Sequence, residues 1–117
     1  MGVSTDGILF YGIDLGEDFD IGEYLASRGL ASEEESDWDL CELSSPECEI
    51  GMHCSGSSPE PFVCIKESHY VNKRGYPTEI PDGLTAKPEW RDQIAAFCAA
   101  NDLPFAEPRW LLASMWW

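Results

Sequence analysis

The sequence predicts an α+β fold with a small, mainly antiparallel sheet of about four strands and two helices. Two apolar segments, residues 7–15 and 62–71, have the composition of β-strands. Residues 88–102 carry apolar side chains at helical spacing. A dense aromatic segment, residues 109–117, is too short to span a bilayer and too apolar to remain in water. We therefore expect this segment to join the sheet as a strand.

The expected order of elements is β-α-β-β-α-β, within a single compact domain over residues 1–117. Residues 7–15 have large apolar side chains at odd and even positions, which is typical of a central strand covered on both faces. Residues 20–29 predict a short helix, because Asp20 can cap the first turn and Glu23 completes a capping-box pattern.

The middle of the chain predicts two neighbouring strands. Residues 47–54 read as a short strand, closed by a turn over residues 55–61 that is rich in Ser, Gly and Pro. Residues 62–71 follow as a strand whose first half is apolar on both faces. In the helix predicted over 88–102, Pro88 suits the first helical position.

The net charge restricts the kind of partner. The chain has 7 Lys and Arg against 22 Asp and Glu, for a formal net charge of -15. This excludes a nucleic-acid binder of the usual basic kind, which neutralises phosphates with Lys and Arg. It also disfavours binding to anionic membranes. The charge favours solubility and attraction to basic surfaces.

Most of this charge lies in residues 14–49, which we call the acidic segment. It holds 13 acidic residues and one basic residue, Arg28, while the rest of the chain has nine acidic and six basic residues. Residues 31–46 are expected to form an acidic surface loop within the domain. Such a charge run can be a solvated face that keeps the protein soluble, or a surface that binds a basic partner.

A binding role predicts a definite set of contact residues. Carboxylates on a helix and a loop can present negative charges at spacings that resemble phosphates, and a competitor for a DNA-binding groove needs many of them. Trp38 can anchor such an interface or hold the loop against the body of the protein. The candidate partner-binding residues are Asp14, Glu17, Asp18, Asp20, Glu23, Glu33, Glu34, Glu35, Asp37, Trp38, Asp39 and Glu42.

The cysteines raise the possibility of a zinc site. Five candidate ligands fall within 24 positions, with His69 close by: Cys41, Cys48, His53, Cys54 and Cys64. Their softness suits zinc, but no C-x2-C pair is present. We expect ordinary reduced cysteines and no cofactor, with Cys64 and Cys98 in the core. The alternative is a zinc site formed by Cys41, Cys48, His53 and Cys54.

The remaining motifs favour a protein that is not an enzyme. Residues 18–23, DFDIGE, contain part of a calcium-loop pattern but lack its third acid and its final Glu. His53 adjoins Cys54, and neighbours on a strand point to opposite faces. No nucleotide-binding, hydrolase or metalloprotease motif is present in the sequence. The sequence also lacks a secretory signal pattern and a membrane-length apolar run, so we expect an intracellular protein.

Four short segments resemble a family of small acidic bacteriophage proteins. They are STDGILFYGI near the start, CSG at 54–56, RGYPTEI at 74–80 and EPRWLLASMWW at 107–117. The likeness covers residues 1–15 and most of 47–117, whereas residues 16–46 diverge. The resemblance implies phage origin and action in the cytoplasm of a host bacterium. Small acidic phage proteins often inhibit CRISPR complexes, restriction enzymes and other nucleases by occupying nucleic-acid sites.

The leading hypothesis is therefore an anti-CRISPR-like or similar anti-defence inhibitor. It would bind a basic surface of a host CRISPR effector or other nuclease complex stoichiometrically, as a DNA mimic, without binding nucleic acid or membrane itself. Two alternatives remain: a small zinc- or thiol-dependent accessory protein, and a structural or adaptor protein of phage development. The metal content of the purified protein distinguishes the first alternative from the leading hypothesis. The identity of the bound partner distinguishes the second.

Overall fold

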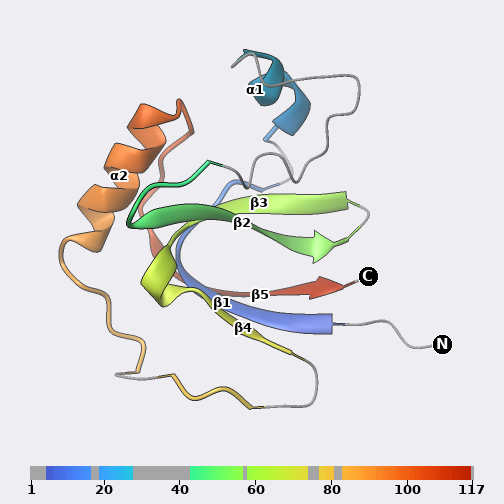
Figure 1. The fold of residues 1–117 in the computed structure, drawn as a ribbon, viewed down its shortest axis with the longest axis vertical. Coiled ribbons are helices and arrows are strands. Elements are labelled where there is room, and N and C mark those ends of the chain that lie inside the picture. Colours follow the sequence, from blue (N-terminus) through green and yellow to red (C-terminus); the bar gives the residue numbers. More distant parts are fainter. Residues whose placement is uncertain are drawn as a thin grey trace.

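The computed structural model describes residues 5–16, 19–27, 43–56, 58–73, 77–80 and 83–116. The elements in chain order are β1 (Thr5–Asp14), α1 (Ile21–Ser27), β2 (Cys48–Ser55), β3 (Ser58–Ile65), the 3₁₀ helix η2 (Lys66–Ser68), β4 (Tyr70–Asn72), α2 (Trp90–Ala100) and β5 (Arg109–Trp116) (Figure 1). The α+β class is confirmed. The described residues form a five-stranded mixed sheet, so the prediction of four strands is wrong in detail.

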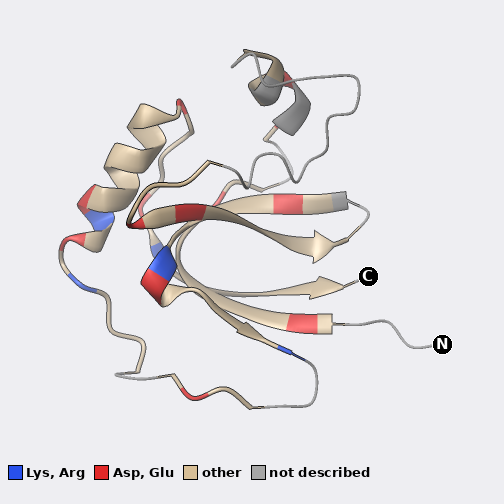
Figure 2. Cartoon of the chain, in the orientation of Figure 1, with Lys and Arg blue, Asp and Glu red and all other residues tan. Residues whose placement is uncertain are grey.

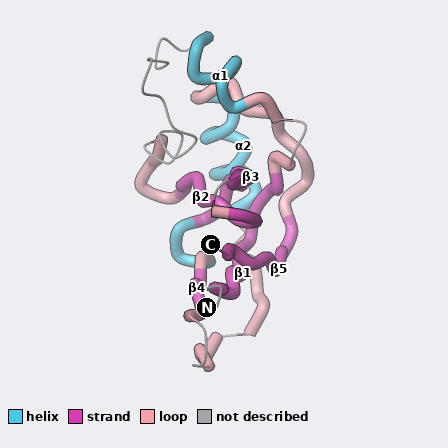
Figure 3. The backbone as a smooth tube through the Cα atoms, turned by 90° about the vertical axis from the view of Figure 1, so that its right-hand side faces the viewer, coloured by secondary structure: helices cyan, strands magenta, loops and turns pink. Residues whose placement is uncertain are grey.

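The sheet closes on itself. Along one edge β1 pairs antiparallel with β5, and along its other edge it pairs antiparallel with β4 and then with β3. β2 is antiparallel to β3 and meets β5 in a parallel pairing at Cys54 and Ser55. Because β3 bonds to both β2 and β1, the strands β1, β3, β2 and β5 form a ring, and β4 extends it from β1. Helix α1 and strand β4 lie at opposite ends of the molecule (Figure 1, Figure 3).

The predicted continuous strand over residues 62–71 is wrong, because η2 divides it into β3 and β4. Ser68 is 1% exposed and explains the break. Its Oγ accepts a hydrogen bond from the Tyr11 backbone N–H at 2.9 Å and donates to the Ile65 carbonyl at 2.7 Å. A buried hydroxyl that satisfies two backbone groups fixes the turn against β1. This turn places His69 beside the end of β3.

The predicted turn over residues 55–61 is also too long, since β3 already begins at Ser58 and runs through Pro59 and Pro61. Proline usually argues against a strand because it lacks the N–H donor. Here Leu15 donates its backbone N–H to the Pro61 carbonyl at 3.1 Å, so the polar groups of Pro61 face β1 and not β2. Because the backbone of Pro61 does not face β2, the N–H group that proline lacks is not needed for the hydrogen bonds between β2 and β3.

Apolar side chains fill both faces of β3. On one face Phe10 and Phe62 stack with ring centroids 3.8 Å apart. On the other face α2 packs against β2 and β3 and buries Trp90, Ile94, Phe97 and Cys98. The expected core positions of Cys64 and Cys98 are confirmed, since both are at most 1% exposed. No helix in the described part of the chain is long and apolar enough to cross a membrane.

The helix predicted over residues 20–29 is observed over Ile21–Ser27. Asp20 caps it as expected, because its Oδ1 accepts a hydrogen bond from the Glu23 backbone N–H at 2.9 Å. Tyr24 is buried, and its hydroxyl donates to the carbonyl of Asn101 just after α2. This contact attaches α1 to the end of α2. A helix of seven residues has only marginal stability alone, so α1 depends on tertiary contacts of this kind.

Candidate functional site

Three of the candidate partner-binding residues lie within the part of the chain that the structure describes. Asp14 is exposed at the end of β1, and Asp20 and Glu23 are exposed at the start of α1. The other nine lie outside the described residues: Glu17, Asp18, Glu33, Glu34, Glu35, Asp37, Trp38, Asp39 and Glu42. Of the acidic loop, only residues 43–46 are described, and Ser44 forms a bridge with Glu49.

Among the residues that the structure describes, acidic ones outnumber basic ones. Figure 2 shows acidic positions on the strands, on α1 and at the start of α2. Two basic residues form close ion pairs outside the acidic segment. Lys87 Nζ lies 2.7 Å from Glu67 Oε1, and Arg91 Nε lies 2.7 Å from Glu107 Oε1. These contacts lower the pKa of both glutamates. Neither ion pair includes a residue of the acidic segment, so neither neutralises its charge.

The first and last acids of the acidic segment each bind a histidine. Asp14 Oδ1 lies 2.9 Å from His53 Nε2, and Glu49 Oε2 lies 2.9 Å from His69 Nδ1. Both imidazoles contact the ring of Phe62, with centroids 6.1 Å and 5.4 Å away. The two ends of the segment are therefore fixed around one buried aromatic ring.

The strand register brings these two ends together. Asp14 on β1 lies opposite Phe62 on β3, and Glu49 on β2 lies opposite Cys64 on β3. The ends thus flank β3 from its two sides, separated by about two strand spacings (roughly 10 Å) across the sheet and by two residues (roughly 7 Å) along β3. The acidic segment leaves the sheet on one side of β3 and returns to it on the other.

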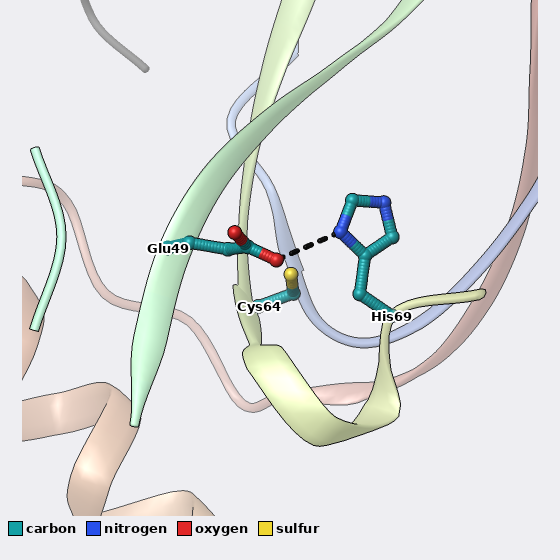
Figure 4. A group of neighbouring side chains, drawn as sticks. All are labelled: Glu49, Cys64 and His69. Carbon is teal, nitrogen blue, oxygen red and sulfur yellow. Dashed lines mark hydrogen bonds and ion pairs between the residues drawn. The ribbon is translucent and has the colours of Figure 1, made fainter. Parts of the chain in front are cut away.

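A cluster of three side chains lies at the Glu49 end (Figure 4). One ligand atom from each of Glu49, Cys64 and His69 lies within 4.8 Å of the other two. Glu49 and Cys64 are cross-strand neighbours, and His69 reaches them from the residue after η2. Figure 4 shows the three side chains pointing toward one another.

The environment of Cys64 keeps its thiol protonated at neutral pH. Burial raises the pKa of Cys64 well above its usual range, and the negative charge of Glu49 raises it further. A thiol of this kind is a poor nucleophile, because the thiolate is the reactive form. The arrangement of thiol, imidazole and carboxylate thus has the components of a nucleophilic site without an activated nucleophile.

The alternative zinc set is not brought together in its described part. Cys48 and His53 occupy opposite faces of β2, because they are five positions apart, and the Cys48 thiol donates to the Gln93 carbonyl of α2 at 3.6 Å. Cys54 is half-buried near the end of β2, with φ of 78°. Cys41 lies outside the described residues.

Sequence reasoning noted Cys64 and His69 but missed Glu49 as their neighbour. Recognition of the antiparallel pairing of β2 with β3 would have placed Glu49 opposite Cys64. The prolines of β3 concealed that pairing. A comparison with known protein families, curated proteins and solved structures finds no match to this chain.

The buried cysteines yield a prediction about thiol reactivity. Burial raises the pKa of Cys48 and of Cys98 to about 11, and raises that of Cys64 further. At pH 8 we expect these three thiols to resist alkylation in the folded protein, and half-buried Cys54 to react. Peptide mass spectrometry of native and denatured samples measures this. Equal labelling of Cys64 and Cys54 in the native sample would contradict the described packing.

Two of these thiols, Cys48 and Cys98, set an alkaline limit on stability. In the unfolded chain they ionise from about pH 8.5, whereas in the folded protein they stay protonated to higher pH. Their contribution to stability is therefore complete below about pH 8.5 and is lost as the pH rises toward about 11.

Proposed function

We propose that this chain is a phage-encoded stoichiometric inhibitor of a host defence complex that handles nucleic acid. It acts in the cytoplasm of the host bacterium. Its acidic segment occupies a basic nucleic-acid-binding surface of a CRISPR effector or another nuclease complex, as an anti-CRISPR-like mimic of DNA. It acts by binding and not by catalysis.

The observation that carries this proposal is the anchoring of the acidic segment at both ends. Asp14 and Glu49 are held by His53 and His69 on either side of β3. These are the two ends of a segment with 13 acidic residues and one basic residue. Both ends of this densely charged segment are thus attached to the same strand, and a high local density of negative charge attracts a basic surface.

The charge of the segment matches what such a partner recognises. Duplex DNA presents one negative charge per about 1.7 Å of helix axis, and its binding proteins collect Lys and Arg along a groove. A dense set of carboxylates can occupy the same groove although it carries no nucleobases. Interaction between exposed charges reaches about 10 Å at 0.1 M salt, so the segment attracts a basic partner before contact.

One further observation supports binding over catalysis, and a second supports phage origin. The thiol that lies beside Glu49 and His69, Cys64, is buried and protonated. The segments STDGILFYGI, RGYPTEI and EPRWLLASMWW resemble those of small acidic phage proteins.

Phage plating measures the proposed inhibition in cells. Expression of this protein in a bacterium with an active CRISPR system is expected to restore plating of a phage that the system targets. The same strain without the defence system serves as the control and should show no change. Unaltered plating in strains that carry each main class of nucleic-acid-targeting defence would contradict the proposal.

A further inference from the structure

The strongest candidate for a second site is the cluster of Glu49, Cys64 and His69. These residues come from three separate elements, yet a carboxylate oxygen, a thiol sulfur and an imidazole nitrogen lie within 4.8 Å of one another. Cys64 is completely buried, while the side chains of Glu49 and His69 are 32% and 18% exposed. The cluster therefore has a closed side and an open side.

The surroundings hold the three side chains in place. The β2–β3 register sets Glu49 directly opposite Cys64. The two hydrogen bonds of Ser68 fix the turn that carries His69, and the ring of Phe62 packs edge-on against the imidazole. Ligands that are positioned by their neighbours before an ion arrives lose little entropy when they bind it.

We propose that Glu49, Cys64 and His69 bind one zinc ion, with water in the fourth position. Zinc accepts carboxylate oxygen, thiolate sulfur and imidazole nitrogen, and three protein ligands with one open position are a known arrangement for it. Calcium and magnesium require oxygen ligands, so a thiol and an imidazole select against them. The open position would lie on the solvent side, where Glu49 and His69 are partly exposed.

Zinc binding requires particular protonation states of Cys64 and His69 and a change in one distance. The Cys64 thiol gives up its proton to solvent and binds as thiolate, and His69 must carry its remaining proton on Nε2 so that Nδ1 can bind. Tetrahedral ligands at about 2.0–2.1 Å from zinc lie about 3.3 Å apart. The 2.9 Å contact between Glu49 and His69 must therefore lengthen by a few tenths of an ångström. Both side chains are partly exposed and can make this adjustment.

None of the three ligands belongs to the candidate partner-binding residues, but Glu49 and His69 also anchor one end of the acidic segment. Zn²⁺ titration tests the metal site and phage plating tests the inhibition, so failure of one is distinguishable from failure of the other. The proposed site also differs from the zinc set of Cys41, Cys48, His53 and Cys54, with which it shares no residue. Each set predicts its own pattern of sensitive variants.

Calorimetric titration of the metal-free protein with Zn²⁺ tests the site, with excess Mg²⁺ present to suppress non-specific attraction to the acidic surface. We expect saturable binding of one Zn²⁺ per chain, with release of the thiol proton. Titration with Co²⁺ is expected to give a thiolate-to-metal charge-transfer absorption band. Absence of stoichiometric Zn²⁺ binding would overturn the proposal.

Variants assign the ligands. His69→Gln should weaken Zn²⁺ binding by more than about tenfold while the fold is retained, since His69 lies near the surface. Cys64→Ser should remove the charge-transfer band. Cys98→Ser is the control, because Cys98 is a buried thiol that packs in α2. Unchanged affinity in His69→Gln, or loss of binding in Cys41→Ser but not in His69→Gln, would overturn the assignment.

Discussion

Replacement of Gly12 by alanine is expected to lower the free energy of unfolding by about 3 kcal/mol or more, or to prevent folding altogether. A Cβ atom at Gly12 would lie 1.9 Å from the Val63 carbonyl oxygen and 2.8 Å from the Cys64 Cα. Both are backbone atoms of β3, so no side chain can move aside. The new methyl group must separate β1 from β3, and that pairing closes the ring of strands.

Gly7→Ala in the same strand is the matched control. A Cβ atom there would lie 3.8 Å from its nearest neighbours, the Cβ and carbonyl oxygen of Asn72, which is ordinary contact. Chemical denaturation followed by circular dichroism compares the two variants. We expect Gly7→Ala to unfold at the wild-type denaturant concentration or slightly above it. Equal stability of the two variants would show that β1 and β3 do not approach as closely as described.

Neutralisation of the acidic segment is expected to reduce affinity for the basic partner by at least about tenfold, chiefly through slower association. The variant combines five substitutions: Glu33→Gln, Glu34→Gln, Glu35→Gln, Asp37→Asn and Asp39→Asn. Surface plasmon resonance at several salt concentrations measures the effect. The wild-type affinity should fall steeply between 0.1 and 1 M salt, where the Debye length drops from about 10 Å to about 3 Å. The variant should show a weaker dependence.

A second variant with the same change in net charge separates location from total charge. It carries Asp6→Asn, Glu60→Gln, Glu79→Gln, Asp82→Asn and Glu89→Gln, all outside the acidic segment. We expect this control to bind nearly as well as the wild type. If both variants lose affinity equally, total charge and not the anchored segment determines binding. If neither loses affinity, the acidic segment is not the binding surface.

The fold was predictable where local pattern determines it. The apolar residues of β1 and the helical spacing in α2 identified these elements, with ends within a few residues of those observed. The break at η2 was not predictable, because it depends on Ser68 reaching a backbone group of Tyr11, 57 positions away. The extent of β3 was not predictable for a similar reason. Pro61 is compatible with a strand only because its backbone polar groups face β1, and this orientation depends on tertiary structure.

The candidate site was predictable in composition but not in geometry. Charge counting alone identified the acidic segment. Its anchoring depends on the register that sets Asp14 and Glu49 on either side of β3, and a register shift of one residue would reverse every side chain. The cluster around Cys64 depends on the same register together with the η2 turn. Tertiary contacts of this kind leave no periodic signal in a single sequence.

Competition with DNA tests the proposed function most directly. The wild-type protein, immobilised at low salt, is exposed to lysate of a bacterium with an active CRISPR or restriction system, and duplex DNA is then added as competitor. We predict that a basic, nucleic-acid-binding component of that system is retained, that DNA displaces it, and that the neutralised variant does not retain it. Retention of the same protein by the neutralised variant, or its persistence in excess DNA, would contradict binding of the acidic segment at a nucleic-acid site.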